Sequence, residues 1–126
     1  MKISLTNREA DVVQVLWDHG PCAVAEVRAH LNADLAYTTV LSILRTLEAK
    51  GYVGHSEQGR GYRYFAKVRE QAARKSALKH LTDKLFKGSA ELLFTHLVAD
   101  QKLTPAQIKR MRELLTAKAN EDTEKS

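Results

Sequence analysis

The sequence predicts a mainly α-helical protein with one small β-hairpin. Apolar side chains recur at helical spacing along most of the chain. The spacing changes to alternation only over residues 52–67, where two short strands flank a glycine-rich turn. Three predicted helices followed by a hairpin give the element order of a winged helix-turn-helix. We therefore expect an N-terminal winged helix-turn-helix over residues 1–68 and a further helical region over residues 69–126.

The first two predicted helices have recognisable boundaries. Thr6 and Glu9 have the spacing of a capping box, and the helix that follows stops at Gly20-Pro21. A shorter helix is expected from about residue 23 to residue 31. Ala23 stands where a Thr or Ser N-cap is usual, so the second helix lacks a side-chain cap at its start.

The third predicted helix, between Asp34 and Gly51, has two contrasting faces. One face is apolar at i, i+3, i+4, i+7 spacing: Val40, Ile43, Leu44 and Leu47. The opposite face repeats that spacing with two hydroxyls, one leucine and one arginine: Thr38, Leu41, Ser42 and Arg45. Acidic residues are absent between Asp34 and Glu48. We expect the first face to join the core and the second to point outward.

The outward face has the chemistry that the major groove of DNA requires. Arg45 can bond guanine through two hydrogen bonds, and the hydroxyls can contact base edges or phosphates. Leucine and threonine methyl groups can pack on the thymine methyl. A helix face without carboxylates does not repel phosphate, and the chain carries a net charge of +5. The same residues also fit a solvated polar face, so this interpretation stays open.

The predicted hairpin is the second candidate contact with DNA. Arg60 lies between Gly59 and Gly61 in the turn, where its side chain could reach a phosphate or the minor groove. A loop arginine in water is the alternative. Arg63 adds a basic edge to the second strand. The tyrosines of this strand more often serve core packing or strand pairing than base contacts.

Three groups of residues resemble the penicillinase-repressor family of bacterial winged-helix regulators, which includes repressors of β-lactamase, of methicillin resistance and of copper response. They are LTNREADVVQVLW at residues 5–17, AYTTV at 36–40 with Leu47 and Lys50-Gly51, and Gly59-Arg60 with Tyr62-x-Tyr64. The resemblance implies a homodimer that binds double-stranded DNA at a palindromic operator with TACA/TGTA-type half-sites and blocks transcription. The predicted DNA-binding residues are Tyr37, Thr38, Thr39, Leu41, Ser42, Arg45, Arg60 and Arg63.

The chain departs from this family where an inducing signal would act. Antibiotic-responsive members are inactivated by proteolysis at an Asn-Phe bond, and the aligned place here reads His96-Leu97. Copper-responsive members carry paired cysteines near the C-terminus, whereas Cys22 is the single cysteine of this chain. Copper sensing through thiolates is thereby excluded, and an upstream sensor or protease stays open as a further partner. No cofactor is expected.

Three predicted helices in residues 69–126 have apolar stripes and favour dimerisation. Thr104, Pro105 and Gln107 mark the start of the last helix as a capping box with proline at N1. Such helices hold too few residues for a core of their own. The predicted dimerisation residues are Leu78, Leu81, Leu85, Leu92, Leu93, Leu97, Ile108, Met111 and Leu115. Packing back onto the N-terminal part is the alternative, and residues after about Ala119 are expected to fray.

Other functions find little support. His19 and Cys22 are close in sequence, but no orienting group or oxyanion loop accompanies them. The five histidines lack metalloprotease-type spacing, and a metal site would require His80 and His96 to meet in space. No enzyme and no metal are therefore predicted. Membrane spans of roughly 18 apolar residues and a signal peptide are also missing, which favours a cytoplasmic protein. A winged-helix module for protein–protein assembly remains the alternative function.

Overall fold

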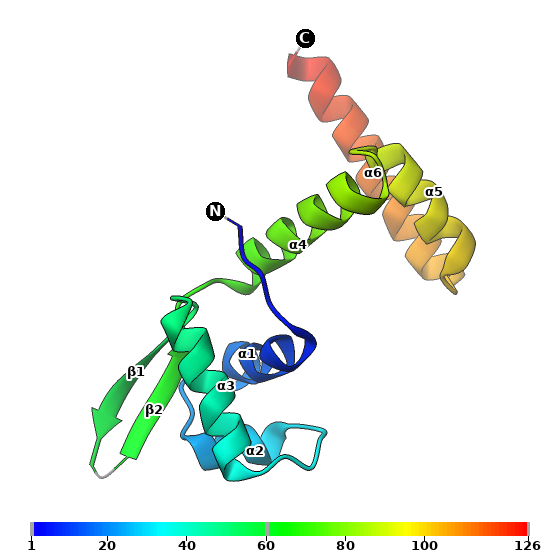
Figure 1. Cartoon of the computed structure of the whole chain (residues 1–126). Helices are drawn as coiled ribbons and strands as arrows, with labels where there is room; N and C mark the ends of the chain where they lie inside the picture. Colours follow the sequence, from blue (N-terminus) through cyan, green and yellow to red (C-terminus); the bar gives the residue numbers. More distant parts are fainter. Residues whose placement is uncertain (1, 60, 126) are drawn as a thin grey trace. The chain divides into compact units, whose positions relative to one another are not determined.

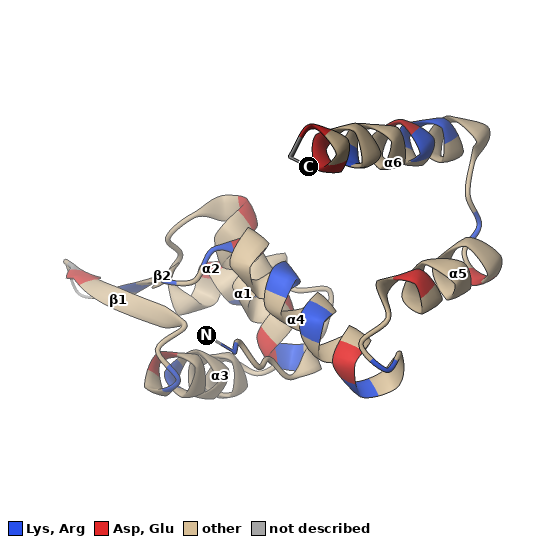
Figure 2. Ribbon diagram, turned by 90° about the horizontal axis from the view of Figure 1, so that it is seen from above, with Lys and Arg blue, Asp and Glu red and all other residues tan. Residues whose placement is uncertain are grey.

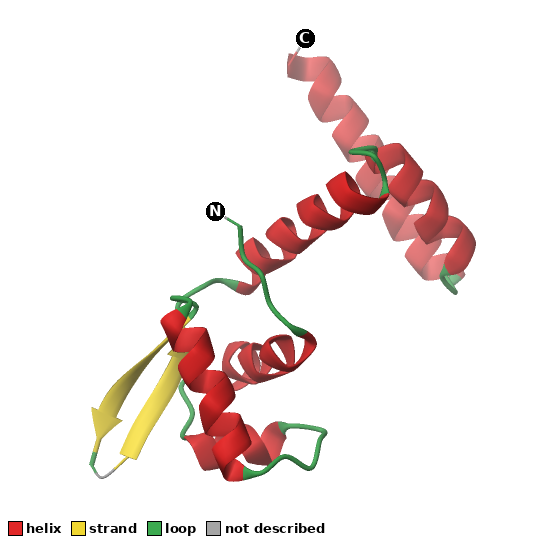
Figure 3. Ribbon diagram, in the orientation of Figure 1, coloured by secondary structure: helices red, strands yellow, loops and turns green. Residues whose placement is uncertain are grey.

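The computed structural model describes residues 2–59 and 61–125, which form two compact units, Met1–Leu81 and Thr82–Ser126. Helices predominate, and the strands of one antiparallel hairpin are β1 (Val53–Gln58) and β2 (Gly61–Ala66) (Figures 1 and 3). The helices are α1 (Asn7–His19), α2 (Val24–His30), α3 (Tyr37–Ala49), α4 (Glu70–Leu85), α5 (Ala90–Asp100) and α6 (Pro105–Lys125). The predicted fold class is confirmed.

Helix α1 starts and stops where its sequence signals lie. The Glu9 backbone N–H donates to Thr6 Oγ1 at 3.2 Å, and the Thr6 N–H donates to Glu9 Oε1 at 2.8 Å. These reciprocal bonds form the predicted capping box. At the other end Gly20 has a φ of +77°, and its N–H donates to the Leu16 carbonyl at 2.9 Å. The chain can therefore leave the helix without an unpaired carbonyl at that position.

Helix α2 begins at Val24, one residue after the expected start, with Ala23 as its N-cap. Ala23 offers no side-chain oxygen to the first-turn N–H groups. Only the Glu26 half of a capping box is present, because the Ala23 N–H donates to Glu26 Oε1 at 3.0 Å. One orphan donor of the first turn thus lacks the partner that a hydroxyl would supply.

Replacing Ala23 by threonine is expected to stabilise the fold. The backbone at position 23 is already extended, as an N-cap requires, and a capping hydroxyl is worth about 0.5–2 kcal/mol. We expect Ala23→Thr to raise the melting temperature measured by circular dichroism. Ala29→Thr is the matched control, because Ala29 is an exposed position inside the same helix. An unchanged or lowered melting temperature for Ala23→Thr would contradict the cap assignment.

Helix α3 ends in a Schellman motif, at the predicted glycine. Gly51 has a φ of +83°, and its N–H donates to the Glu48 carbonyl at 3.0 Å. The next N–H, that of Tyr52, donates to the Leu47 carbonyl at 3.0 Å. Glycine is suited to this left-handed position because a Cβ would be strained there. The motif turns the chain from α3 directly into β1.

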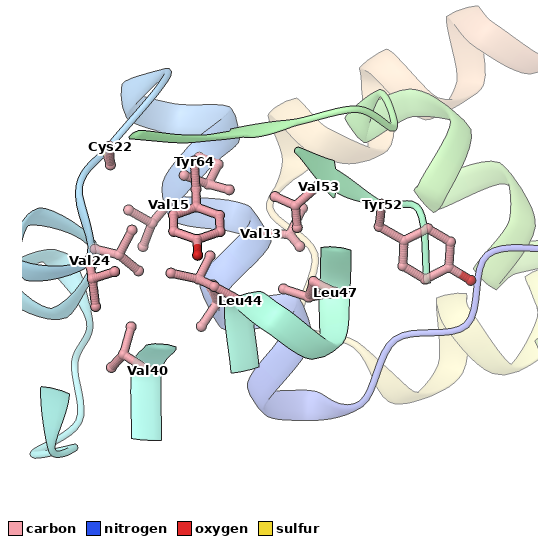
Figure 4. Close-up of a cluster of buried hydrophobic side chains, with 13 residues drawn as sticks. Val13, Val15, Cys22, Val24, Val40, Leu44, Leu47, Tyr52, Val53 and Tyr64 are labelled. Carbon is pink, nitrogen blue, oxygen red and sulfur yellow. The ribbon is translucent and has the colours of Figure 1, made fainter. Parts of the chain in front are cut away.

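The core of the first unit lies where α1, α2, α3 and the hairpin meet (Figure 4). Three residues of the predicted apolar face of α3 are completely buried: Val40, Leu44 and Leu47. The fourth, Ile43, packs at the edge of this cluster. The Tyr64 ring enters the same cluster from β2 and points toward α3. The face of α3 that we predict to contact DNA is therefore carried on a firmly packed helix.

The hairpin is joined to the helices by a short backbone bridge that the sequence did not reveal. Its own register runs from Val53↔Ala66 to Gln58↔Gly61. Cys22 pairs with Tyr64 outside the hairpin: the Cys22 N–H donates to the Tyr64 carbonyl at 2.9 Å, and the reverse bond is 2.8 Å. The segment between α1 and α2 thus acts as a third, very short strand beside β2.

The beginning of α4 belongs to the first unit. The Trp17 indole Nε1–H donates to the Val68 carbonyl at 2.9 Å, and the Ile3 N–H donates to Ser76 Oγ at 2.8 Å. Ala73 is buried. We expected a division after residue 68, whereas the two compact units divide after Leu81, inside α4. The difference arises because α1 and the N-terminal segment hold the first turns of this helix.

In the second unit α6 starts at its predicted capping box. The Thr104 N–H donates to Gln107 Oε1 at 2.8 Å, and the Gln107 N–H donates to Thr104 Oγ1 at 3.1 Å. The expectation of fraying after Ala119 was wrong, because α6 continues to Lys125. A Lys118–Asp122 pair at 3.7 Å and the bond from Thr123 Oγ1 to the Ala119 carbonyl at 2.9 Å support these turns. Across residues 2–59 and 61–125, no helix is both long and apolar enough to span a membrane.

Candidate nucleic-acid interface

The exposed face of α3 is the first part of the candidate interface. The side chains of Thr38, Thr39, Ser42 and Arg45 are exposed, and Tyr37 at the start of the helix is 47% exposed. Charged side chains on α3 occur only toward its C-terminal end (Figure 2). Six turn and cap residues, 31–36, separate α2 from α3. Five of the six predicted DNA-binding residues of α3 are therefore accessible to solvent.

Leu41 differs from its predicted neighbours on this face. It is half-buried and packs against the core cluster. Leu41 lies one residue after the fully buried Val40, so part of its side chain turns inward. The expectation that the whole side chain points outward was wrong, and only its outer part is available to a thymine methyl group.

Arg45 lies near the wing. The pKa of Tyr64 is raised, first because the phenol is buried and then because of the Glu48 charge, while the Arg45 guanidinium opposes both. The Arg45 side chain is itself exposed. An arginine has five N–H donors, so an exposed one can offer several of them to a base or a phosphate.

Arg28 is a residue of this region that the sequence analysis missed. It lies in the last turn of α2, and its Nε–H donates to the Leu35 carbonyl at 2.7 Å. Leu35 directly precedes Ala36, the N-cap of α3, which makes no side-chain capping bond. Arg28 therefore fixes the entry of the chain into α3. A bond between a helix and the following turn gives no periodic signal in the sequence.

Arg63 has a structural partner inside the protein. Its Nη1–H donates to Glu26 Oε1 at 3.1 Å, and its Nη2–H donates to the Pro21 carbonyl at 2.7 Å. The pKa of Glu26 is lowered, chiefly by the Ala23 N–H and further by Arg63. These contacts attach β2 to the start of α2. Contact between Arg63 and DNA, which we predicted, would have to compete with them.

The wing carries one buried and one exposed tyrosine. Tyr64 is only 2% exposed and serves the core, as expected, whereas Tyr62 is 45% exposed. The Tyr62 ring lies against His55 with a centroid separation of 4.6 Å. Gly59 has a φ of +64° at the turn, which a glycine adopts without strain. Arg60, the predicted phosphate contact, lies outside the described residues.

A second candidate surface is made of apolar side chains in the second unit. Within residues 82–124, no side chain belongs to the buried core. An open groove of about 410 Å³ is lined mainly by α5 and α6 residues: Phe94, Val98, Gln101, Leu103, Ile108, Met111, Arg112 and Leu115. Of the predicted dimerisation residues, the most exposed are Leu85 at 72%, Leu78 at 54% and Leu115 at 53%. Leu93 and Met111 are half-buried, and Leu81, Leu92, Leu97 and Ile108 are exposed.

His19 and Cys22 do not form a base and nucleophile. The Cys22 side chain is buried and donates from Sγ to the Gly20 carbonyl at 3.3 Å. Burial and the Glu26 charge raise the pKa of the Cys22 thiol, which disfavours the reactive thiolate. His19 instead stacks on His30 with ring centroids 3.8 Å apart.

His80 and His96 are the pair that a histidine metal site would require. His96 Nδ1 instead lies 3.5 Å from Asp100 Oδ2, and its ring meets the Phe86 ring at a steep angle with centroids 5.4 Å apart. Among residues 2–59 and 61–125 there is no cluster of three or more histidine, cysteine, aspartate or glutamate side chains suited to hold a metal ion.

Comparisons with known proteins agree with this architecture. The methicillin resistance regulatory protein MecI of Mammaliicoccus sciuri is 19% identical over 116 residues, which cover 90% of this chain and 94% of that protein. An uncharacterised 16.5 kDa protein of Latilactobacillus sakei is 26% identical over 123 residues, covering 96% of this chain and 84% of that protein. The crystal structure of a transcriptional regulator from Thermotoga maritima superimposes with a TM-score of 0.52 at 18% identity, over 95% of this chain and 78% of that one, and shows the same fold.

A match to a protein family covers most of the chain. Residues 5–117 match the penicillinase repressor family, from the capping box of α1 to the middle of α6. Both compact units therefore take part in the match. This chain belongs to the penicillinase repressor family of transcriptional regulators.

Proposed function

We propose that the chain is a transcriptional repressor that binds a palindromic operator as a homodimer, with α3 in the major groove and the hairpin as the wing. The observation that carries this proposal is the exposed surface of α3. It presents Thr38, Ser42 and Arg45 side by side, and acidic residues are absent from the first three turns of the helix. Such a surface offers donors to base edges and does not repel phosphate. Half-sites of the TACA/TGTA type follow from the family resemblance.

A homodimer is favoured by the second unit. Its helices leave large apolar side chains in contact with water, including Leu85 at 72% and Leu114 at 70% exposure. Apolar surface of this extent marks an interface. A second copy of the chain would provide an identical set of apolar helices, and two-fold symmetry would match two half-sites of a palindrome.

Operator binding can be tested by fluorescence anisotropy with a duplex from the region upstream of the coding sequence. A shuffled duplex of the same composition serves as the reference, and both are titrated at two or three salt concentrations. We expect a preference of about 10³-fold or more for the upstream duplex, with an affinity that falls steeply as salt rises. Equal and weak binding to both duplexes would overturn the proposal and favour an assembly module.

The roles of the two arginines can be separated by substitution. Arg45→Ala is expected to weaken operator binding by about 1–3 kcal/mol and to relax base preference at one position. Arg60→Ala should weaken binding to every sequence and reduce the slope of log affinity against log salt by about 1. Arg110→Ala, at an exposed position of α6, is the matched control for loss of one positive charge. If all three variants bind like the wild type, α3 and the wing do not contact DNA.

A further inference from the structure

A contact between the side chains of Glu48 and His55 joins α3 to the hairpin. His55 Nδ1 of β1 lies 2.5 Å from Glu48 Oε2 of α3. Both side chains are one-third exposed, so water and salt reach the pair. The His55 ring also lies between the two tyrosines of β2, with centroid separations of 4.6 Å to Tyr62 and 5.5 Å to Tyr64.

The position of this pair in the hairpin allows it to influence the orientation of the wing. His55 is opposite Tyr64, and Glu57 is opposite Tyr62, so all four side chains belong to one face of the hairpin. The base of the hairpin is fixed by the buried residues Val53 and Tyr64. A two-stranded hairpin is marginally stable by itself. The Glu48–His55 contact thus attaches this face of the wing to α3 at the edge of the packed core, directly opposite Tyr64.

The two faces of the hairpin are attached to different helices. Arg63 reaches Glu26 and the Pro21 carbonyl near the start of α2. His55 reaches Glu48 of α3, the same helix that carries Arg45. Glu48 lies one turn after Arg45 on α3. Any movement of the wing at His55 therefore changes the distance between the wing and the face of α3 that carries Arg45.

We propose that His55 is a positioning residue for DNA binding: paired with Glu48, it sets the orientation of the wing relative to the recognition face of α3. This inference rests on the proposed function. The wing would then reach the phosphate backbone while α3 occupies the major groove. If the wing is already held in its DNA-bound orientation relative to α3, less conformational entropy is lost on binding, and the affinity for DNA is higher.

The link depends on the Glu48 carboxylate. A His55 ring that carries a proton on Nδ1 needs this acceptor, because Tyr62 and Tyr64 meet the imidazole with their own rings. Glu57 lies on the same face of the hairpin but stands opposite Tyr62. Removing the charge of Glu48 should therefore loosen the link and weaken operator binding.

Glu48→Gln tests the proposal in the full-length protein. Operator affinity is measured by anisotropy for the wild type and for two variants. The matched control is Glu57→Gln, which removes the same charge from the same hairpin face. For a partly exposed pair we expect Glu48→Gln to bind the operator about two- to five-fold more weakly than Glu57→Gln does. Glu48→Gln should still bind the operator more tightly than the shuffled duplex, because the residues of α3 that we propose to read the bases are unchanged.

Two results would overturn the positioning role. If Glu48→Gln binds the operator as tightly as Glu57→Gln does, Glu48 does not orient the wing. If His55→Phe, which retains an aromatic ring against Tyr62, lowers affinity equally in the wild type and in Glu48→Gln, the two residues are not coupled. A wild type that does not distinguish operator from shuffled duplex would contradict the proposed function instead. Melting temperatures of all variants verify that the fold is retained.

Discussion

Replacing two exposed leucines of the second unit in the variant Leu97→Glu/Leu115→Glu is expected to yield a monomer that binds its operator at least about 100-fold more weakly. Leu97 is 44% and Leu115 53% exposed in the single chain. Burial of a leucine side chain in an interface is worth about 1.5–3 kcal/mol. A buried, unpaired carboxylate costs several kcal/mol instead. Two such changes per chain place four carboxylates in the interface of a dimer, which is enough to dissociate it.

Loss of the dimer should lower DNA affinity, because a monomer can bind only one half-site at a time. In a dimer, binding of one winged helix raises the effective concentration of the second near its half-site, and such linkage contributes about 10²–10⁴ in affinity. The glutamates lie on α5 and α6, outside the unit that contains α3. A monomer should therefore retain weak binding to a single half-site.

Sedimentation equilibrium gives the oligomeric state, and anisotropy gives the operator affinity. The matched control is Thr95→Glu/Thr116→Glu, which introduces the same charges at exposed polar positions of the same two helices. We expect the control to remain a dimer. A wild type that is monomeric at the concentrations at which it binds its operator would contradict the homodimer, as would a leucine variant that stays dimeric.

The local part of this structure could be predicted from the sequence because its signals involve residues that are close in the chain. The capping boxes at Thr6 and Thr104 and the glycines at positions 20 and 51 fixed the ends of helices to within about a residue. The apolar spacing of α3 predicted which of its faces is buried. Period-two alternation located the hairpin.

The relationships that the sequence could not show are contacts between distant residues. Arg63 looked like a wing arginine, yet Glu26 and Pro21 bind it from 37 and 42 residues away. Leu41 belonged to the polar stripe by spacing, but tertiary packing draws part of it into the core. The end of α6 was missed because its last residues are polar, and a local ion pair sustains the helix without a core.

The buried carboxylate of Glu9 is another such long-range feature, and it predicts a large loss of stability in Lys50→Met. Lys50 Nζ contacts both Glu9 carboxylate oxygens, at 2.8 and 2.9 Å, and joins the end of α3 to the start of α1. The Glu9 side chain is 6% exposed and that of Lys50 is 37% exposed. Removing one partner of a buried pair costs about 3–5 kcal/mol. Because Lys50 is partly solvated, we expect about 3 kcal/mol at pH 7.

The effect should depend on pH in a defined direction. Burial alone would raise the pKa of Glu9, but the hydrogen bonds from Lys50 and from the Thr6 N–H outweigh burial and lower it. A carboxyl group with a lowered folded-state pKa contributes stability above its unfolded pKa, and this contribution is lost as pH falls through the folded pKa. In Lys50→Met the burial effect remains without the ammonium group, so the folded state binds a proton more readily. The difference between the variant and the wild type should therefore shrink on acidification.

Urea unfolding followed by circular dichroism between pH 7 and pH 3 measures this difference. Lys75→Met removes a charge from an exposed position of α4 and should change stability by less than about 0.5 kcal/mol. The double variant Glu9→Gln/Lys50→Met should recover part of the loss, because a neutral amide can still accept the Thr6 N–H bond without burying an unpaired charge. A loss in Lys50→Met that is the same at pH 3 and pH 7 would mean that packing of the lysine chain, and not the Glu9 charge, holds the end of α3 to α1.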